Sequence, residues 1–212
     1  RGNYMKPRAT LECSAVDQTM NVTAAGIEIA HIYFVSTTSQ ASALIDFSAA
    51  ADNLYIHDCG FDMYTATAAS TILGIDAIGA NNWMLIERCY FSVDGAFGAC
   101  IDLTATLDAV VSDCVFMNSA GTQTATITVG AATDRFLINH CTFLISNAAV
   151  VSGCIDGTGA TIASGGLIQD CRFGDRSTIA VAAFSAGECE LAENYEAGVG
   201  AADGGALITA IA

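Results

Sequence analysis

The chain repeats one short motif: an apolar residue, two mostly polar residues, cysteine, any residue and phenylalanine. The clear copies are Ile56–Phe61, Ile86–Phe91, Val111–Phe116, Ile138–Phe143 and Ile168–Phe173. A weaker copy, Ile29–Phe34, precedes them, and a decayed copy, Leu191–Tyr195, follows. The phenylalanines at positions 34, 61, 91, 116, 143 and 173 are separated by 27, 30, 25, 27 and 30 residues. Self-similarity at such a period is typical of solenoids and repeat arrays.

Each repeat holds three short pieces that look like strands. The first is typically Ile-Asp-apolar, as in Ile45–Phe47, the second is apolar-x-apolar, as in Leu54–Ile56, and the third is Cys-x-Phe. Such alternation puts the apolar members on one face of a strand. A helical solenoid would instead need a 3.6-residue period. The sequence therefore predicts an all-β fold, a right-handed, single-stranded parallel β-helix with about seven coils of 25–30 residues.

We expect residues 1–18 to form an N-terminal entry or cap segment and residues 19–212 to form a single parallel β-helix domain. The first segment holds Pro7, the only proline, and three of the seven basic residues. A cap is expected because the open end of a solenoid leaves strand edges unpaired. At the other end, Gly204-Gly205 and the apolar 206–212 are typical of a last strand or closing cap.

The chain is strongly acidic, with a net charge of −15 from 22 acidic and 7 basic residues. Binding to nucleic acid through its phosphates requires basic patches, so we expect no nucleic-acid partner. We also expect no membrane partner. The longest uncharged run, Phe136–Ile155, is broken by polar residues and contains a whole motif, whereas a transmembrane helix needs about 20 predominantly apolar residues.

Nine cysteines are present, and five of them occupy the same motif position: Cys59, Cys89, Cys114, Cys141 and Cys171. Their repetition predicts small, buried side chains that pack on one another as free thiols. Stacked side chains point in parallel, which is poor geometry for a disulfide. Spacings typical of zinc sites are absent. We expect the thiols to stay reduced because the chain is made in a reducing cytoplasm.

Aspartate recurs in the first piece of the repeat, at Asp46, Asp76, Asp102 and Asp156, with Thr128 in the fourth copy. In this pattern the aspartate points outward, so Asp46, Asp76 and Asp102 are expected about one strand spacing apart, roughly 4.8 Å. Carboxylates that close raise each other's pKa or recruit a cation. This aspartate column is therefore a candidate Ca²⁺ site, and Ca²⁺ is the one cofactor considered. The alternatives are a solvated acidic face and the paired carboxylates of a glycosidase.

A third column precedes the cysteines: His31, Asp58, Arg88, Asp113, His140, Asp170 and Glu193. Acidic and basic types largely alternate from coil to coil, which predicts a ladder of exposed ion pairs, each contributing roughly 0–1 kcal/mol. A sharper hypothesis is an acid–base site made of Asp113, His140 and Asp170. No nucleophile accompanies these residues in the sequence.

The repeat resembles, over nearly the whole chain, the right-handed β-helix superfamily of pectate lyases, polygalacturonases and phage tailspikes. Pectate lyases place Arg or Lys beside a Ca²⁺-binding Asp cluster, and polygalacturonases carry Asn-x-Asp, Asp-Asp, Gly-His-Gly and Arg-x-Lys motifs. None of these is found here, and Lys6 is the only lysine, so no catalytic residue is carried over. The plain coils with Ala/Thr-rich turns look more like short β-helix proteins encoded among the structural genes of tailed phages.

This likeness implies a non-enzymatic structural component of a phage virion, such as a capsid or tail decoration or a fibre module. It also implies location in the virion, contact with other virion proteins, and self-association as a homotrimer. The alternative is a carbohydrate-active enzyme, a polysaccharide lyase or hydrolase, or a glycan-binding β-helix that uses the aspartate column. A cleft with carboxylates and aromatic platforms would favour the alternative, whereas a flat self-association face would favour the structural role.

Overall fold

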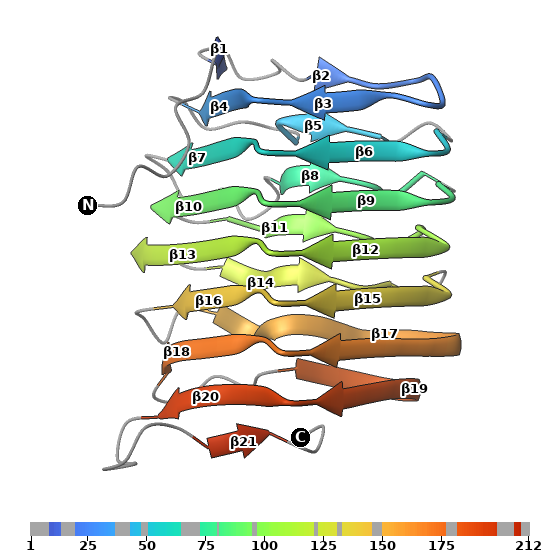
Figure 1. Cartoon of the computed structure of the whole chain (residues 1–212), viewed down its shortest axis with the longest axis vertical. Helices are drawn as coiled ribbons and strands as arrows, with labels where there is room; N and C mark the ends of the chain where they lie inside the picture. The colour runs from blue at the N-terminus through green and yellow to red at the C-terminus, as the bar shows by residue number, and fades with distance from the viewer. Residues whose placement is uncertain are drawn as a thin grey trace.

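The computed structural model describes residues 9–13, 20–36, 43–47, 51–64, 73–79, 81–94, 97–120, 123–130, 133–145, 150–176, 182–198 and 206–208. Within these ranges all regular structure is β, and the strands stack into flat rows along one axis (Figure 1). No helix among the described residues is long and apolar enough to cross a membrane.

One face of the stack, sheet A, collects the Cys-x-Phe pieces. All its strands run parallel except the last, β21, which pairs antiparallel with β20. In spatial order the strands are β1 (Ala9–Cys13), β4 (Ile32–Ser36), β7 (Gly60–Tyr64), β10 (Tyr90–Asp94), β13 (Val115–Ala120), β16 (Thr142–Ile145), β18 (Arg172–Arg176), β20 (Asn194–Gly198) and β21 (Ala206–Ile208).

The other two faces collect the first and second pieces of each repeat. The first pieces are β2 (Met20–Asn21), β5 (Ile45–Asp46), β8 (Leu73–Asp76), β11 (Ala99–Asp102) and β14 (Gln123–Thr128). The second pieces are β3 (Glu28–Ala30), β6 (Leu54–His57), β9 (Met84–Glu87), β12 (Asp108–Ser112) and β15 (Arg135–Asn139). The long β17 (Val150–Gln169) joins both rows into one sheet, and β19 (Ala182–Ala192) pairs with it.

This arrangement confirms the predicted all-β fold class and the parallel β-solenoid. The number of coils differs slightly from the prediction: the structure has about five turns, whereas seven coils were predicted. At the C-terminal end the decayed motif is followed by β21, whose antiparallel direction stops the parallel stacking.

The interior is organised by the repeated phenylalanines. Each ring faces the ring of the next coil, with centroids 4.5–5.0 Å apart and planes within 13° of parallel. All six rings are fully buried: Phe34, Phe61, Phe91, Phe116, Phe143 and Phe173. The ring spacing matches the spacing of parallel strands, so each ring stacks on its neighbour only when the coils are in register.

The corner between the second and third pieces has a left-handed backbone. Its residue has φ between 50° and 58° in every copy: His31, Asp58, Arg88, Asp113, His140, Asp170 and Glu193. Short polar residues such as Asp tolerate this region better than bulky ones. The left-handed backbone at the corner therefore explains part of the residue composition of this column, in addition to the predicted ion pairs.

The cysteine after this corner is buried and free, as predicted. Its thiol is also a hydrogen-bond donor: Cys114 Sγ lies 3.2 Å from the Ser112 carbonyl and 3.9 Å from the Ile86 carbonyl of the preceding coil. The other four ladder cysteines make the same two contacts. Burial raises the pKa of the Cys114 thiol, so the group stays protonated and able to donate.

The decayed last repeat supports this role of the cysteine. Asn194 takes the cysteine position, is fully buried, and donates from Nδ2 to the Ile168 carbonyl at 2.8 Å. Its Oδ1 accepts a bond from the Cys171 amide at 3.0 Å. The cysteines and Asn194 thus share one contact, a donor group that reaches the carbonyl of the apolar motif residue in the preceding coil, which purely apolar packing would not require.

The division of the chain at residue 18 stays a prediction. Part of the expected cap segment, Ala9–Cys13, forms β1 at the edge of sheet A, in parallel register with β4. At the other end, Ala206–Ile208 form the expected last strand. The remaining residues of both predicted end segments, 1–8, 14–18, 204–205 and 209–212, lie outside the described residues.

We predict that Phe116→Ala lowers the free energy of unfolding by about 4 kcal/mol, because it leaves a cavity and removes a ring from between two stacked neighbours. Leu144→Ala is the matched control, since Leu144 is largely exposed on β16, and should cost less than about 1 kcal/mol. Urea unfolding measures both. Equal losses of unfolding free energy in the two variants would contradict the conclusion that the stacked phenylalanines are the main support of the coils.

Candidate functional site

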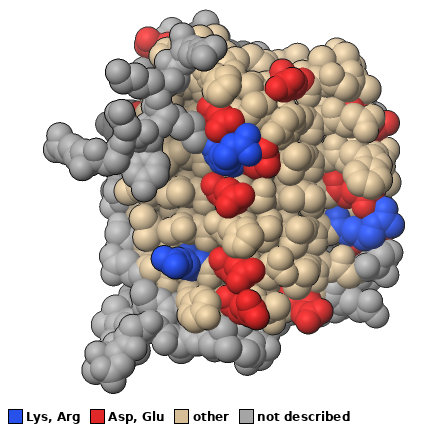
Figure 2. Space-filling view, in the orientation of Figure 1, with Lys and Arg blue, Asp and Glu red and all other residues tan. Residues whose placement is uncertain are grey.

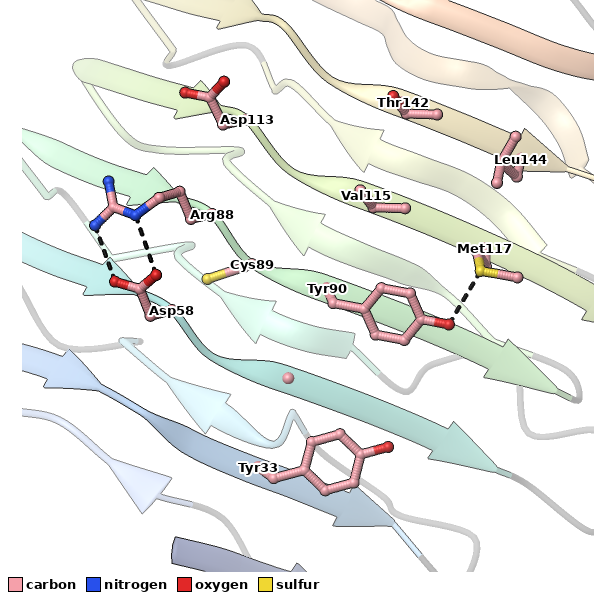
Figure 3. A pocket seen from close by; sticks show the side chains of 11 residues that line it. Tyr33, Asp58, Arg88, Cys89, Tyr90, Asp113, Val115, Met117, Thr142 and Leu144 are labelled. Atoms are coloured by element: carbon pink, nitrogen blue, oxygen red, sulfur yellow. Dashed lines mark hydrogen bonds and ion pairs between the residues drawn. The ribbon is translucent and has the colours of Figure 1, made fainter. Parts of the chain in front are cut away.

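A groove crosses the outer surface of sheet A. Its volume is about 880 Å³, and it is lined by residues from five neighbouring strands, β4, β7, β10, β13 and β16, and from the corners before them. Figure 3 shows Tyr33 and Tyr90 on the floor, Arg88 and Asp113 along the corner side, and Met117 and Leu144 on the opposite side. It is therefore a site built by the stacking of coils.

The groove exists because the residue between Cys and Phe changes size from coil to coil. Tyr33, Gly60, Tyr90, Val115 and Thr142 are aligned in register across the five strands. Gly60 has no side chain, and the ring of Tyr33 lies over it: a Cβ at Gly60 would meet Tyr33 Cδ2 at 2.3 Å. Val115 and Thr142 are short, so the floor stays open beyond Tyr90.

Both tyrosine hydroxyl groups have partners. Tyr33 donates to Asp62 Oδ2 at 3.3 Å, and burial together with the negative Asp62 raises the pKa of Tyr33. The Tyr90 hydroxyl lies 3.0 Å from the sulfur of Met117 (Figure 3). These contacts fix the orientation of both rings along the groove.

One end of the corner side carries an ion pair. Arg88 reaches back one coil to Asp58, with Nε 3.1 Å from Oδ1 and Nη2 2.9 Å from Oδ2. Mainly through this guanidinium, with a contribution from His57, the pKa of Asp58 falls to about 2. Arg88 also contacts Glu87 and the Tyr55 hydroxyl. The predicted ion-pair ladder is thus confirmed for Asp58 and Arg88.

Beside this pair lies a histidine that the sequence analysis did not single out. His57 is 11% exposed and sits between two carboxylates, with Nδ1 2.7 Å from Asp58 Oδ2 and Nε2 2.8 Å from Glu28 Oε1. Its ring also stacks on Tyr55 at 4.1 Å. Burial lowers its pKa, but the two carboxylates outweigh this effect and the pKa of His57 is raised. A protonated ring donates to both carboxylates.

The rest of the corner column is looser. His140 Nε2 lies 3.6 Å from Asp170 and Nδ1 lies 4.0 Å from Asp113. Side chains of His140 and Asp113 are 54% and 58% exposed. Figure 2 shows this mixture of acidic and basic groups scattered over a largely neutral face. Both distances are longer than an ordinary hydrogen bond, so this geometry adds no support to the acid–base hypothesis for Asp113, His140 and Asp170.

The aspartate column is also formed as expected. Asp46, Asp76 and Asp102 are in register on β5, β8 and β11. Two of them accept bonds from their own turns: Asp76 Oδ1 from the Ile78 amide at 3.2 Å, and Asp102 from the amide and hydroxyl of Thr104. Burial raises the pKa of Asp76 to about 6, with the negative Asp102 and Asp46 adding to the rise. Burial also raises the pKa of Asp102.

The calcium site at Asp46, Asp76 and Asp102 stays a prediction. No group of three or more His, Cys, Asp or Glu side chains with metal-binding geometry occurs within the described residues. The three turn hydrogen bonds use carboxylate oxygens that a cation would otherwise bind. Calcium-dependent melting is the measurement that tests this site.

The groove was missed because the variable residue of Cys-x-Phe was treated only as a surface position. Read down the repeats, this position changes from Tyr to Gly to Tyr and then to Val and Thr. That pattern of large and small residues was available in the sequence and marks a surface of uneven height. The sequence analysis instead predicted a site in the aspartate column.

Comparison with known proteins yields no relative: no family model, no curated protein and no solved structure matches the chain.

We predict that Asp76→Asn stabilises the protein at pH 7.5 and has little effect at pH 4. A carboxyl group with a folded pKa of about 6, above its ordinary value of 3.8, favours folding while protonated, and this stabilisation is lost as the pH rises from about 4 to above 6. Asparagine stays neutral and keeps an oxygen for the Ile78 amide. Since Asp76 is only partly buried, screening reduces the expected gain to about 1 kcal/mol.

Thermal melting of both proteins at the two pH values measures this difference. A gain of about 1 kcal/mol corresponds to a rise in Tm of roughly 2–4 °C for a chain of this size. A variant that is destabilised more at pH 7.5 than at pH 4 would contradict this prediction and show that the charge of Asp76 itself supports the turn.

Proposed function

We propose that the protein is a non-enzymatic structural component of a phage virion, a decoration or fibre module that contacts other virion proteins. The fold supports this proposal: it is a rigid solenoid whose coils are held in register by buried side chains over about five turns. The resemblance of its plain coils to short phage β-helix proteins supplies the link to a virion.

The chemistry of the groove supports a non-enzymatic role. A general acid needs a pKa near the working pH, whereas the Asp58 carboxyl beside the groove has a pKa of about 2 and is held by Arg88. The histidine nearest to it, His57, has both ring nitrogens within 2.8 Å of carboxylates. These groups are arranged to hold three successive coils together.

Self-association as a homotrimer is the second part of the proposal. Three exposed apolar side chains lie on the turns that lead into β9 and β12: Ile78, Trp83 and Leu107. Trp83 is 65% exposed and has a left-handed backbone with φ of 62°, an unfavourable conformation for a bulky residue. Asn53, one coil earlier, has the same conformation with a residue that tolerates it. Trp83 is thus exposed on a backbone that is unfavourable for a bulky residue. An exposed tryptophan is suited to a contact between copies of the chain.

A second candidate is a glycan-cleaving enzyme that uses the aspartate column. The observation that favours it is the pKa of about 6 for Asp76, since a glycosidase needs one carboxyl that holds its proton near neutral pH. The in-register neighbours Asp46 and Asp102 would supply the second carboxylate. The turn hydrogen bonds of Asp76 and Asp102 oppose this use.

Sedimentation equilibrium tests the structural proposal. We predict a species of about three times the 21.8 kDa chain mass at micromolar concentration. Trp83→Ser should weaken the trimer by about tenfold or more, because large aromatic residues at interface centres often contribute over 1.4 kcal/mol. Tyr195→Ser is the control, since Tyr195 is also exposed but lies on sheet A. A monomer that releases reducing sugar from a polysaccharide would contradict the proposal and favour the enzyme.

A further inference from the structure

We propose that the groove on sheet A is a docking site for an extended, basic segment of another protein, in which Lys or Arg alternates with aliphatic residues. This inference rests on the proposed role as an assembly component and adds the chemistry of its partner. Three observations support it: the length of the groove, the apolar side chains on its floor and outer side, and the charge of its corner side.

The groove has the dimensions of a short extended peptide. It spans five adjacent strands, from β4 to β16, and four strand spacings correspond to about 19 Å. An extended chain rises roughly 3.3 Å per residue, so about six residues fit along it. Because the groove runs across the strands, the peptide would be held through its side chains.

The floor and the outer side of the groove suit aliphatic side chains. Val115, Met117 and Leu144 line it, and Leu144 is 41% exposed. The tyrosine hydroxyls are already committed to Asp62 and Met117. A glycan needs several free polar partners to replace its hydration, and this apolar surface offers few. The observations therefore favour a peptide with apolar side chains over a sugar.

The corner side of the groove suits basic side chains. Arg88 neutralises Asp58, but the next corner residue, Asp113, is 58% exposed, and within the described part of the chain its one ion-pair partner is His140 at 4.0 Å. Of the corner residues that line the groove, Asp58 and Asp113 are acidic and Arg88 is basic, so this side carries a net negative charge. A basic residue of the partner can therefore pair with Asp113 on this side of the groove. A polyanion would be repelled.

The probe for this site is a fluorescein-labelled hexapeptide that alternates lysine and leucine, and fluorescence anisotropy measures its binding to the full chain. We expect saturable binding that weakens as salt is added, while the same peptide with glutamate in place of lysine does not bind. Asp113→Lys should weaken binding by about tenfold or more. Thr142→Trp, which fills the floor without changing charge, should do the same.

Glu190→Lys is the matched control, because it makes the same charge change at an exposed residue on β19, which pairs with β17 outside sheet A. It should leave binding within about twofold. Equal binding in Asp113→Lys and Glu190→Lys would overturn the site, because the attraction would then reflect only the net charge. Binding of a neutral oligosaccharide that Thr142→Trp abolishes would assign the groove to a glycan instead.

The sedimentation state of the same samples separates this inference from the proposed function. A trimer that ignores the lysine peptide refutes the docking site and leaves the structural role standing. A monomer that cleaves polysaccharide refutes the structural role whatever the peptide does.

Discussion

The corner before each cysteine is the constraint on which the rest of the structure depends. The chain turns there through one left-handed residue, and the amide of that residue donates to the carbonyl two residues before the cysteine position of the next coil, as Arg88 does to Ser112 at 3.1 Å. A buried carbonyl without a donor is costly. The cysteine thiol adds a second donor to that carbonyl, and Asn194, in the last copy, donates to the Ile168 carbonyl of the coil before it. Because the thiol also reaches the carbonyl of the coil before, the same small group closes the turn and links two coils.

Fixing the corners fixes the register of every outer column. Phenylalanine two residues beyond the cysteine then stacks on its copies, and the variable residue between them faces outward on sheet A. The groove follows from this geometry, because Tyr33, Gly60, Tyr90, Val115 and Thr142 become neighbours only when the coils are aligned. Its charged side follows from the same cause, since each left-handed corner residue points out beside it. The interior thus determines the surface on which a partner could act.

The repeat in the sequence was sufficient to predict the fold class, the three strand-like pieces and the buried cysteine and phenylalanine columns, because period and alternation translate directly into stacking and burial. The thiol hydrogen bonds could not be predicted, since alternation does not distinguish an apolar position from one with a donor. The corner residues were interpreted only as charges, because φ is not visible in the order of Asp, His and Arg. His57 was missed for a related reason: Asp58 adjoins it in the sequence, but Glu28 lies beside it only after coils one repeat apart are stacked.

Pulsed alkylation followed by mass spectrometry tests the central claim most directly, that the cysteine ladder holds the coils in register. The account predicts that Cys59, Cys89, Cys114, Cys141 and Cys171 are free yet protected in the native protein. They should become reactive together, at the denaturant concentration where the whole solenoid unfolds. Ladder thiols that react under native conditions, that become exposed at widely different concentrations, or that are joined in disulfides would contradict it.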